Sequence, residues 1–89
     1  MKIAVVIPAY NEAATIRDVA TRTLEILSQV IVVDDGSTDA TAAALAGLPL
    51  TLISNPVNLG KGASLWRGFA LALAEGADAV ITLDGDAQH

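Results

Sequence analysis

Two pairs of aspartates are the residues in this sequence best placed to do chemistry. They are Asp34 with Asp35, and Asp84 with Asp86, where Gly85 separates the two carboxylates. Each pair follows a short apolar run, so the four carboxylates would share one edge of a sheet and repel one another without a cation or hydrogen-bond donors. Such hard oxygens suit Mg²⁺ or Mn²⁺. Asp and Gly also form solvated turns, but the position after a buried strand favours a metal site at Asp84 and Asp86.

The segment that begins with Asp34 and Asp35 also fits an ordinary turn followed by a helix. Ser37 or Thr38 is the expected N-cap of that helix. A cap accounts for the hydroxyl groups but not for both carboxylates. We expect one carboxylate of the pair to accept a hydrogen bond from a nucleobase N–H, because that role needs an ionised acceptor on a rigid strand end.

A lysine between two glycines opens another predicted helix. Free backbone N–H groups at a helix start, together with the Lys61 ammonium group, could contact phosphate. The segment is not a Walker A motif, which needs Ser or Thr at Gly62 and glycine at Asn55. A dinucleotide fingerprint would need glycine at Leu65. Phosphate contact and a simple helix start are both open for Gly60 and Lys61.

The aromatic and histidine side chains carry weaker signals. Trp66 and Phe69 lie on an apolar helical stripe, which places them in the predicted core rather than against a sugar. Tyr10 follows a predicted strand and lies either beside a base or on the surface. His89 is the last residue, where chains tend to fray, so a serine, histidine and acid triad is not expected.

Short apolar runs must position these side chains. The runs cover residues 3–7, 30–33, 50–53 and 79–83, and they are rich in β-branched residues with little alternation. That pattern is typical of parallel strands buried on both faces. Helical segments separate the runs, which gives the order βαβαβαβ. The sequence therefore predicts a Rossmann-like, three-layer α/β/α fold with a four-stranded parallel sheet and ligands at the carboxyl ends of its strands.

The predicted helices differ in length and in the strength of their signals. Asn11 is the expected N-cap of the first, and a short Ala-rich helix is expected over residues 38–46. The third ends at Gly76. Apolar residues at helical spacing form the buried stripes of the first helix, at Ile16, Val19, Ala20, Thr23, Leu24 and Leu27, and of the third, at Ala63, Trp66, Phe69, Ala70 and Leu73.

Composition limits the kinds of partner. The 89 residues form at most one small domain, and a net charge of −5 argues against nucleic acid while it fits a metal cation. The absence of cysteine excludes disulfides and is compatible with a cytoplasmic location. No apolar run has the length of a membrane span, so any membrane contact is expected through parts of a longer parent protein.

Four segments together resemble the amino-terminal half of glycosyltransferase family two, the enzymes with the GT-A fold. They read VVIPAYNEAATI, VIVVDDGSTDAT, NLGKGASLWRGFALA and GADAVITLDGDAQH, in the family's order and spacing. The closing LDGDAQH looks most like the branch that transfers a sugar from a nucleotide to a polyprenyl phosphate, which includes dolichyl-phosphate mannose synthases. One departure is Gly85, where many members of that branch carry alanine. The larger departure is that family members continue well past residue 89.

This resemblance implies roles for individual residues. The residues implied to bind a UDP- or GDP-linked sugar donor, with Lys61 added as the phosphate candidate, are Pro8, Ala9, Tyr10, Glu12, Asp34, Asp35, Lys61, Asp84 and Asp86. Asp84 and Asp86 would be the DxD pair that binds Mg²⁺ or Mn²⁺, and Gln88 would complete the metal's contacts. The implied sheet order is three, two, one, four. Residues 1–89 would then be the donor-binding half of an inverting, metal-dependent transferase, inactive without the acceptor half, with the parent in the cytoplasm or at the cytoplasmic face of a membrane.

Two other functions are alternatives to this one. A receiver-type signalling domain also uses acidic residues on such a sheet, but Ser54 and Asn55 stand where its phosphoacceptor aspartate would be. A non-catalytic fragment that self-associates through an exposed sheet edge beside the fourth strand is the other alternative.

Overall fold

The computed structural model describes residues 1–85 and shows a four-stranded parallel sheet in the order β3-β2-β1-β4. The strands are β1 (Ile3–Ala9), β2 (Gln29–Asp35), β3 (Thr51–Asn55) and β4 (Ala79–Thr82). The helices are α1 (Ile16–Leu24), the 3₁₀ helix η1 (Ala43–Leu45) and α2 (Lys61–Ala74). The predicted fold class and the implied strand order are confirmed.

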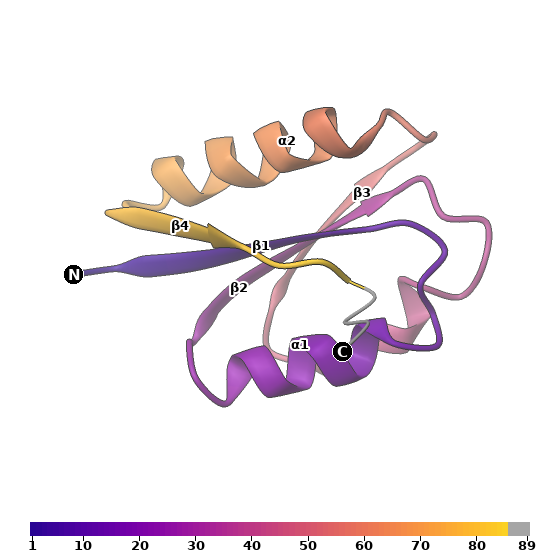
Figure 1. Ribbon diagram of the computed structural model, residues 1–89, viewed down its shortest axis with the longest axis horizontal. Helices are drawn as coiled ribbons and strands as arrows, with labels where there is room; N and C mark the ends of the chain where they lie inside the picture. Colours follow the sequence, from indigo (N-terminus) through magenta and orange to yellow (C-terminus); the bar gives the residue numbers. More distant parts are fainter. Residues whose placement is uncertain (86–89) are drawn as a thin grey trace.

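Helices cover both faces of the sheet, as Figure 1 shows, with α2 on one side and α1 on the other. Alternate residues of β1 point to opposite faces, so Val5 and Ile7 pack toward α1 whereas Ala4 and Val6 pack toward α2. The two apolar clusters therefore lie on either side of the central strands. This is the predicted three-layer arrangement.

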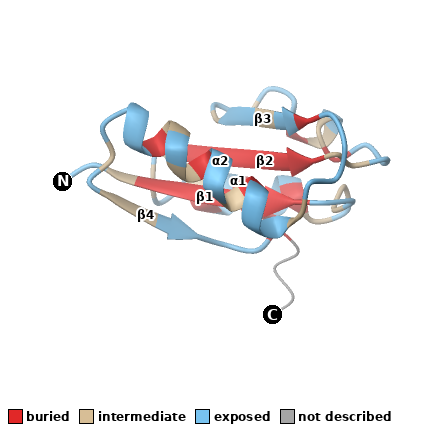
Figure 2. Ribbon diagram, turned by 90° about the horizontal axis from the view of Figure 1, so that it is seen from above, coloured by how far each residue is buried: buried red, intermediate tan, exposed pale blue. Residues whose placement is uncertain are grey.

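The central and edge strands differ in burial. Figure 2 shows β1 and β2 buried along most of their length, whereas β3 and β4 are largely exposed or half-buried. The expectation that all strands are buried on both faces is wrong for β3 and β4, because each pairs with a neighbour on one side only among the described residues. The two buried strands run further than predicted, and they carry Pro8, Ala9 and the Asp34–Asp35 pair at their carboxyl ends.

The expected helix over residues 38–46 is largely absent, and only the three residues of η1 form a 3₁₀ turn. The backbone N–H groups of Thr38 and Asp39 donate to the side chain of Asn11. The N–H of Thr41 donates to the Asp39 carboxylate. These polar side chains satisfy the backbone locally and compete with helix formation, so neither Ser37 nor Thr38 caps a helix here.

Two further expectations about the helices are wrong. Asn11 does not cap α1, which begins after Thr15; it adopts a left-handed backbone with φ of 51° and holds the next loop instead. Trp66 is 72% exposed. The buried face of α2 consists of Ser64, Gly68 and Ala72, with Phe69 half-buried beside them.

Small residues explain this orientation of α2. A Cβ atom added to Gly68 would lie 2.3 Å from Cγ1 of Val6, so the helix approaches β1 too closely for any side chain at that position. Close approach lets the backbone of α2 pack directly against the sheet. The larger apolar residues Trp66 and Leu73 consequently lie on the outer surface.

Candidate functional site

A cavity of about 360 Å³ opens at the carboxyl edge of the sheet. It is bordered by the ends of β1 and β2, the start of α2 and the segment after β4. Its lining residues are Pro8, Ala9, Tyr10, Glu12, Asp35, Asn58, Gly60, Lys61, Asp84 and Gly85. Among the described residues predicted to bind the donor, all but Asp34 lie in this lining, including residues more than 70 positions apart. Tyr10 is partly exposed here, as both of its predicted alternatives allow.

Asp35 ends β2 at the wall of the cavity, and the residue is 4% exposed. Its oxygens accept hydrogen bonds from the N–H groups of Leu59 at 2.7 Å and Gly60 at 2.9 Å. Burial raises the pKa of Asp35, but hydrogen bonds led by that from Leu59 outweigh burial and leave the pKa below its ordinary value. Asp35 is therefore an ionised group held in a dense set of donors.

Behind Asp35 lies a chain of polar side chains that the sequence reasoning missed. The amide nitrogen of Asn55, the last residue of β3, donates to Asp35 at 2.9 Å and to the hydroxyl of Ser64 at 3.1 Å. Arg67 donates to the amide oxygen of Asn55. Asn55 and Ser64 are both buried. The position of Asn55 at the end of a predicted strand was the one sequence signal for this chain of hydrogen bonds. The spacing of residues did not indicate its partners Ser64 and Arg67 on α2.

Asp34 lies outside the lining of the cavity. The residue is buried, and its carboxylate accepts the N–H of Ser37 at 3.2 Å, as in a turn. The Ser37 hydroxyl in turn accepts the N–H of Asn11 at 2.9 Å. Asp34 thus connects the turn after β2 to the loop after β1.

Thr41 and Asp39 hold the loop that carries Glu12. The hydroxyl of Thr41 accepts the N–H of Glu12 at 2.9 Å and donates to the carboxylate of Asp39. Asp39 also accepts the N–H of Ala13 at 3.2 Å. The hydrogen bond from Thr41 is the main reason why the pKa of Asp39 lies below its ordinary value.

Lys61 and Asp84 form an ion pair across the cavity, with Nζ 2.9 Å from Oδ1 of Asp84. Lys61 is the first residue of α2, and Asp84 follows β4. The Asp84 carboxylate thus already contacts a positive charge, the Lys61 ammonium group, as a carboxylate that binds cations can. The sequence analysis predicted phosphate contact for Lys61 and metal binding for Asp84, but it did not predict the ion pair between them.

Of the three residues predicted to bind metal, Asp84 lies within residues 1–85. Asp86 and Gln88, the other two predicted metal ligands, lie outside the described residues. Within residues 1–85, no three His, Cys, Asp or Glu side chains form a group that could hold a metal ion. Gly85 is tightly placed, because an added Cβ would lie 3.1 Å from a Glu12 carboxylate oxygen and 3.2 Å from Ile16. An alanine at this position would therefore require the Glu12 carboxylate or Ile16 to shift slightly.

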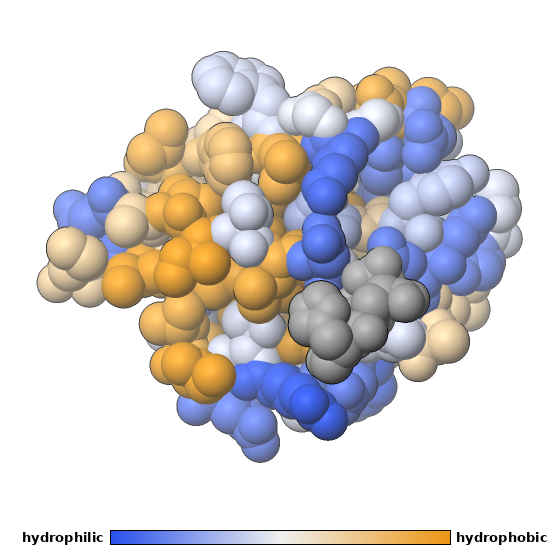
Figure 3. Space-filling view, viewed as in Figure 1, coloured by the Kyte–Doolittle hydropathy of each residue, from blue (hydrophilic) through white to orange (hydrophobic). Residues whose placement is uncertain are grey.

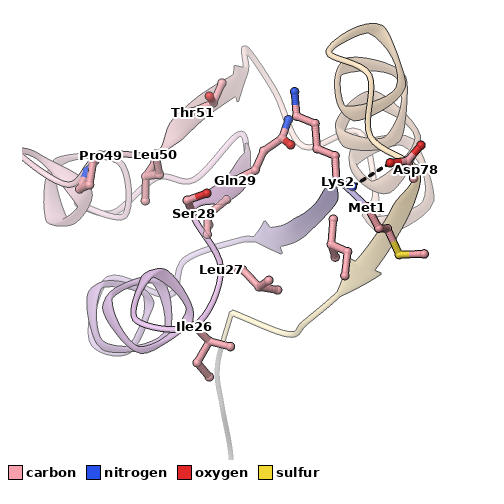
Figure 4. Close-up of a pocket in the computed structure, with 12 residues that line it drawn as sticks. Met1, Lys2, Ile26, Leu27, Ser28, Gln29, Pro49, Leu50, Thr51 and Asp78 are labelled. Atoms are coloured by element: carbon pink, nitrogen blue, oxygen red, sulfur yellow. Dashed lines mark hydrogen bonds between the residues drawn. The ribbon is translucent and has the colours of Figure 1, made fainter.

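Other concave and apolar surfaces lie away from this edge. A wider hollow of about 1000 Å³ lies at the amino ends of the strands; Figure 4 shows its lining, including Gln29, Leu50 and the hydrogen bond from Lys2 to Asp78. Its charged groups do not converge, so it carries no comparable chemistry. Figure 3 shows apolar side chains gathered toward β4, where Ile81 and Leu83 are exposed, and polar ones toward the carboxyl edge. No helix within residues 1–85 is long and apolar enough to span a membrane.

The parallel sheet, with a polar cavity at the carboxyl ends of β1, β2 and β4, defines a Rossmann-like α/β protein with its candidate ligand site at that edge. Residues 4–89 match glycosyl transferase family 2, and the chain belongs to that family. The match confirms the resemblance and removes the receiver-domain alternative.

Relatives of known activity and structure are similar along nearly the whole chain. Glucosyl-3-phosphoglycerate synthase from Mycobacterium tuberculosis is 37% identical over an alignment of 95 positions, which covers 94% of this chain and 28% of the relative. The undecaprenyl-phosphate 4-deoxy-4-formamido-L-arabinose transferase from Aeromonas hydrophila is 36% identical, and the match covers 98% of this chain and 29% of the relative. The chain therefore spans less than a third of the length of these relatives.

Solved structures of the mycobacterial synthase have the same fold. Its complex with Mn²⁺, uridine diphosphate and glucosyl-3-phosphoglycerate superposes with a TM-score of 0.76 at 36% identity, covering 94% of this chain and 33% of the synthase. Another complex contains Mg²⁺ and uridine diphosphate, with the same TM-score and identity.

Proposed function

We propose that this chain is the donor-binding part of an inverting, metal-dependent glycosyltransferase. The observation that carries the proposal is the cavity that brings Pro8, Tyr10 and Glu12 together with Lys61 and Asp84. A nucleoside would lie against the ends of β1 and β2, and its diphosphate would reach the start of α2 and Asp84. Uracil is the preferred candidate for the base, because the similar synthase structures contain uridine diphosphate.

The residues at the mouth of the cavity suit a diphosphate and a hard cation. Lys61 places a positive charge at the start of α2, where free backbone N–H groups also favour phosphate oxygens. Asp84, with Asp86 and Gln88 beyond the described residues, would hold Mg²⁺ or Mn²⁺. Bound there, the ion would supply Lewis-acid stabilisation of the departing diphosphate. Diphosphate binding would require Lys61 to exchange its contact with Asp84 for one with phosphate.

The proposed reaction joins an acceptor oxygen to the anomeric carbon of the sugar. The new bond forms on the face opposite the leaving group, the bond from the anomeric carbon to the diphosphate breaks, and the configuration inverts. The electron pair of the broken bond leaves with the nucleoside diphosphate. The acceptor is proposed to be a polyprenyl phosphate or another phosphorylated compound, since the relatives named above act on both kinds. We place the parent enzyme in the cytoplasm or at the cytoplasmic face of a membrane.

Titration calorimetry with UDP and GDP, each with and without Mn²⁺, tests donor binding. We expect Mn²⁺-dependent heat with UDP, and loss of that dependence in Asp84→Asn. Asp78→Asn is a matched control, because Asp78 lies at the opposite edge and accepts a hydrogen bond from Lys2. Absence of metal-dependent binding at millimolar UDP would overturn the proposal.

Self-association through β4 is the second candidate property, and one observation favours it. Ile81 in β4 and Leu83 just after it are 45% and 41% exposed, and within residues 1–85 β4 pairs only with β1. Exposed edge strands can pair with another copy of the same chain. Sedimentation velocity over a range of concentrations would distinguish a monomer from such a dimer.

A further inference from the structure

Thr15 immediately precedes α1, at the position where a threonine commonly caps a helix. A capping hydroxyl accepts a backbone N–H from the first turn of its own helix. Within residues 1–85, Thr15 makes no such bond. Its hydroxyl instead donates to the carbonyl oxygen of Gly85, 70 positions further along the chain, at 2.9 Å. The side chain therefore joins the start of α1 to the segment after β4.

The short segment after β4 is attached to a different part of the fold at each of its residues. The N–H of Leu83 donates to a carbonyl of β1 at 3.2 Å. The Asp84 carboxylate accepts from Lys61 at the start of α2. Gly85 is buried, and its carbonyl accepts from Thr15. Thr15 therefore supplies the attachment on the side of α1.

Close packing restricts Gly85 from the same turn. An added Cβ atom would lie 3.1 Å from Oε2 of Glu12 and 3.2 Å from Cδ1 of Ile16. The turn itself is closed by hydrogen bonds, because the N–H groups of Thr15 and Ile16 both donate to the carbonyl of Glu12, at 3.0 and 2.9 Å. A rigid turn thus contacts Gly85 through both a hydrogen bond and van der Waals packing.

Gly85 stands between Asp84 and Asp86, the two aspartates proposed to bind the cation. Glycine has the greatest backbone freedom of any residue, so two carboxylates joined through it need a restraint from elsewhere to bind one ion. The carbonyl that Thr15 holds belongs to the planar peptide unit that joins Gly85 to Asp86. Fixing this peptide unit limits the orientations open to the second carboxylate. Groups behind the ligands commonly orient them in this way.

We infer that Thr15 is a positioning residue for the metal site, whose hydroxyl fixes the Gly85 peptide so that Asp84 and Asp86 bind one Mg²⁺ or Mn²⁺ together with the diphosphate. Thr15 is not among the described residues that line the cavity, so it acts through Gly85 and not by contact with the donor. The inference rests on the proposed function, because it assigns a task to a residue behind the same donor site.

Thr15→Val removes the hydroxyl and nearly keeps the shape of the side chain. We expect the gain in UDP affinity that Mn²⁺ provides to fall about fivefold, the effect of one neutral hydrogen bond, whereas UDP affinity without metal stays the same. Thr15→Ser retains a hydroxyl and should retain most of the gain. Titration calorimetry up to millimolar UDP, with and without Mn²⁺, measures both. An unchanged gain in folded Thr15→Val, or an equal loss with and without Mn²⁺, would overturn the inference.

Thr23→Val is the matched control for this substitution. Thr23 lies in the same helix, and its hydroxyl donates to the carbonyl of Val19 at 2.7 Å. The control therefore loses a hydrogen bond of the same chemical type, but one that stays within α1. We expect its Mn²⁺-dependent gain in UDP affinity to equal that of the unmodified protein. A fivefold loss in this control as well would overturn the inference, because a general loosening of α1 would then account for the effect of Thr15→Val.

NMR relaxation of the metal-free protein tests the contact without any ligand. In the unmodified protein, the backbone heteronuclear NOE of Gly85 should match that of Ile81 in β4, because a hydrogen bond and packing both hold Gly85. In Thr15→Val it should fall below the value of Ile81. A low NOE at Gly85 in the unmodified protein, or equal values in the two proteins, would contradict the inference. Failure of the unmodified protein to bind UDP with Mn²⁺ would instead contradict the proposed function, and the NOE comparison would still decide whether Thr15 holds Gly85.

Discussion

Lys61 Nζ lies 2.9 Å from Oδ1 of Asp84, so an ion pair joins the first residue of α2 to the segment after β4. Both side chains are about two-thirds exposed, at 66% and 65%. Exposed ion pairs contribute little to stability, typically 0 to about 1 kcal/mol. The contact is therefore better suited to binding than to folding: it keeps a positive and a negative charge together at the mouth of the donor cavity.

Lys61→Met should weaken UDP binding without unfolding the protein. Loss of the ammonium group removes a charged contact to phosphate, worth roughly tenfold in affinity, while the urea midpoint should hardly change. Calorimetry and urea denaturation measure the two effects. Lys2→Met is the control at the amino edge, where Lys2 donates to the carbonyl of Glu75. Equal UDP affinity in both variants would exclude Lys61 as a phosphate contact.

Gly36→Ala should be more damaging than Gly47→Ala. Both glycines have positive φ values, 71° and 83°, so both substitutions carry a backbone penalty of about 1 kcal/mol. Only at Gly36 would the new Cβ clash with backbone, that of Val57 and Asn58, whereas nothing lies within 4 Å of Gly47. We expect an additional loss of about 1–3 kcal/mol in the free energy of unfolding, measured by urea denaturation. Similar losses in the two variants would show that residues 57–58 do not pack on Gly36.

Alanine at two glycines of α2 should have opposite effects. Gly68→Ala forces a Cβ toward the fully buried Val6, which should cost about 1–3 kcal/mol of unfolding free energy. Gly62→Ala meets nothing within 4 Å and gains helix propensity, so it should stabilise by up to about 1 kcal/mol. Thermal unfolding of both variants checks the signs. A stabilising Gly68→Ala would mean that α2 packs on another face.

Acid should destabilise the protein partly through Asp35 and Asp39. Both pKa values are lower in the folded state than the ordinary value of 3.8, so folding favours the ionised carboxylates. Their contribution to stability is complete above the unfolded-state pKa and is lost as the pH falls below about 4 through the folded-state values. Asp39→Asn should flatten the fall in urea midpoint between pH 5 and pH 3, relative to Asp18→Asn on the exposed surface of α1. An unchanged slope would show that Asp39 contributes nothing to acid sensitivity.

Trp66→Ala should leave the monomer almost as stable as before, within about 0.5 kcal/mol, because the side chain is 72% exposed. Phe69→Ala should cost more, since Phe69 packs against the buried cluster beside α2. The fluorescence of the only tryptophan in the sequence should resemble that of tryptophan in water. A blue shift at higher protein concentration would show that another copy covers this face.

Much of the fold and of the candidate site follows from the sequence, because a parallel sheet brings the carboxyl ends of all its strands to one edge. The alternation of apolar runs with helical segments predicted the three layers. The positions of Tyr10, Asp35 and Asp84 after separate runs predicted that they would meet. The short helix over residues 38–46 was wrong because Asn11 and Asp39 take up its backbone N–H groups, and such side-chain competition has no periodic signal.

The tertiary structure decided which face of α2 is buried and what Asp35 contacts. Hydropathy favoured Trp66 and Leu73 as core, but close packing on Val6 needs the missing side chain of Gly68, and that steric requirement exists only once helix and sheet are placed together. Asn55 and Leu59 lie 20 and 24 residues from Asp35, so their hydrogen bonds to it depend on the path of the whole chain. The residue types determined the parallel sheet and the edge at which the functional side chains lie. Packing decided that Asp84 pairs with Lys61 at the cavity and that Asp35 accepts hydrogen bonds from the loop before α2.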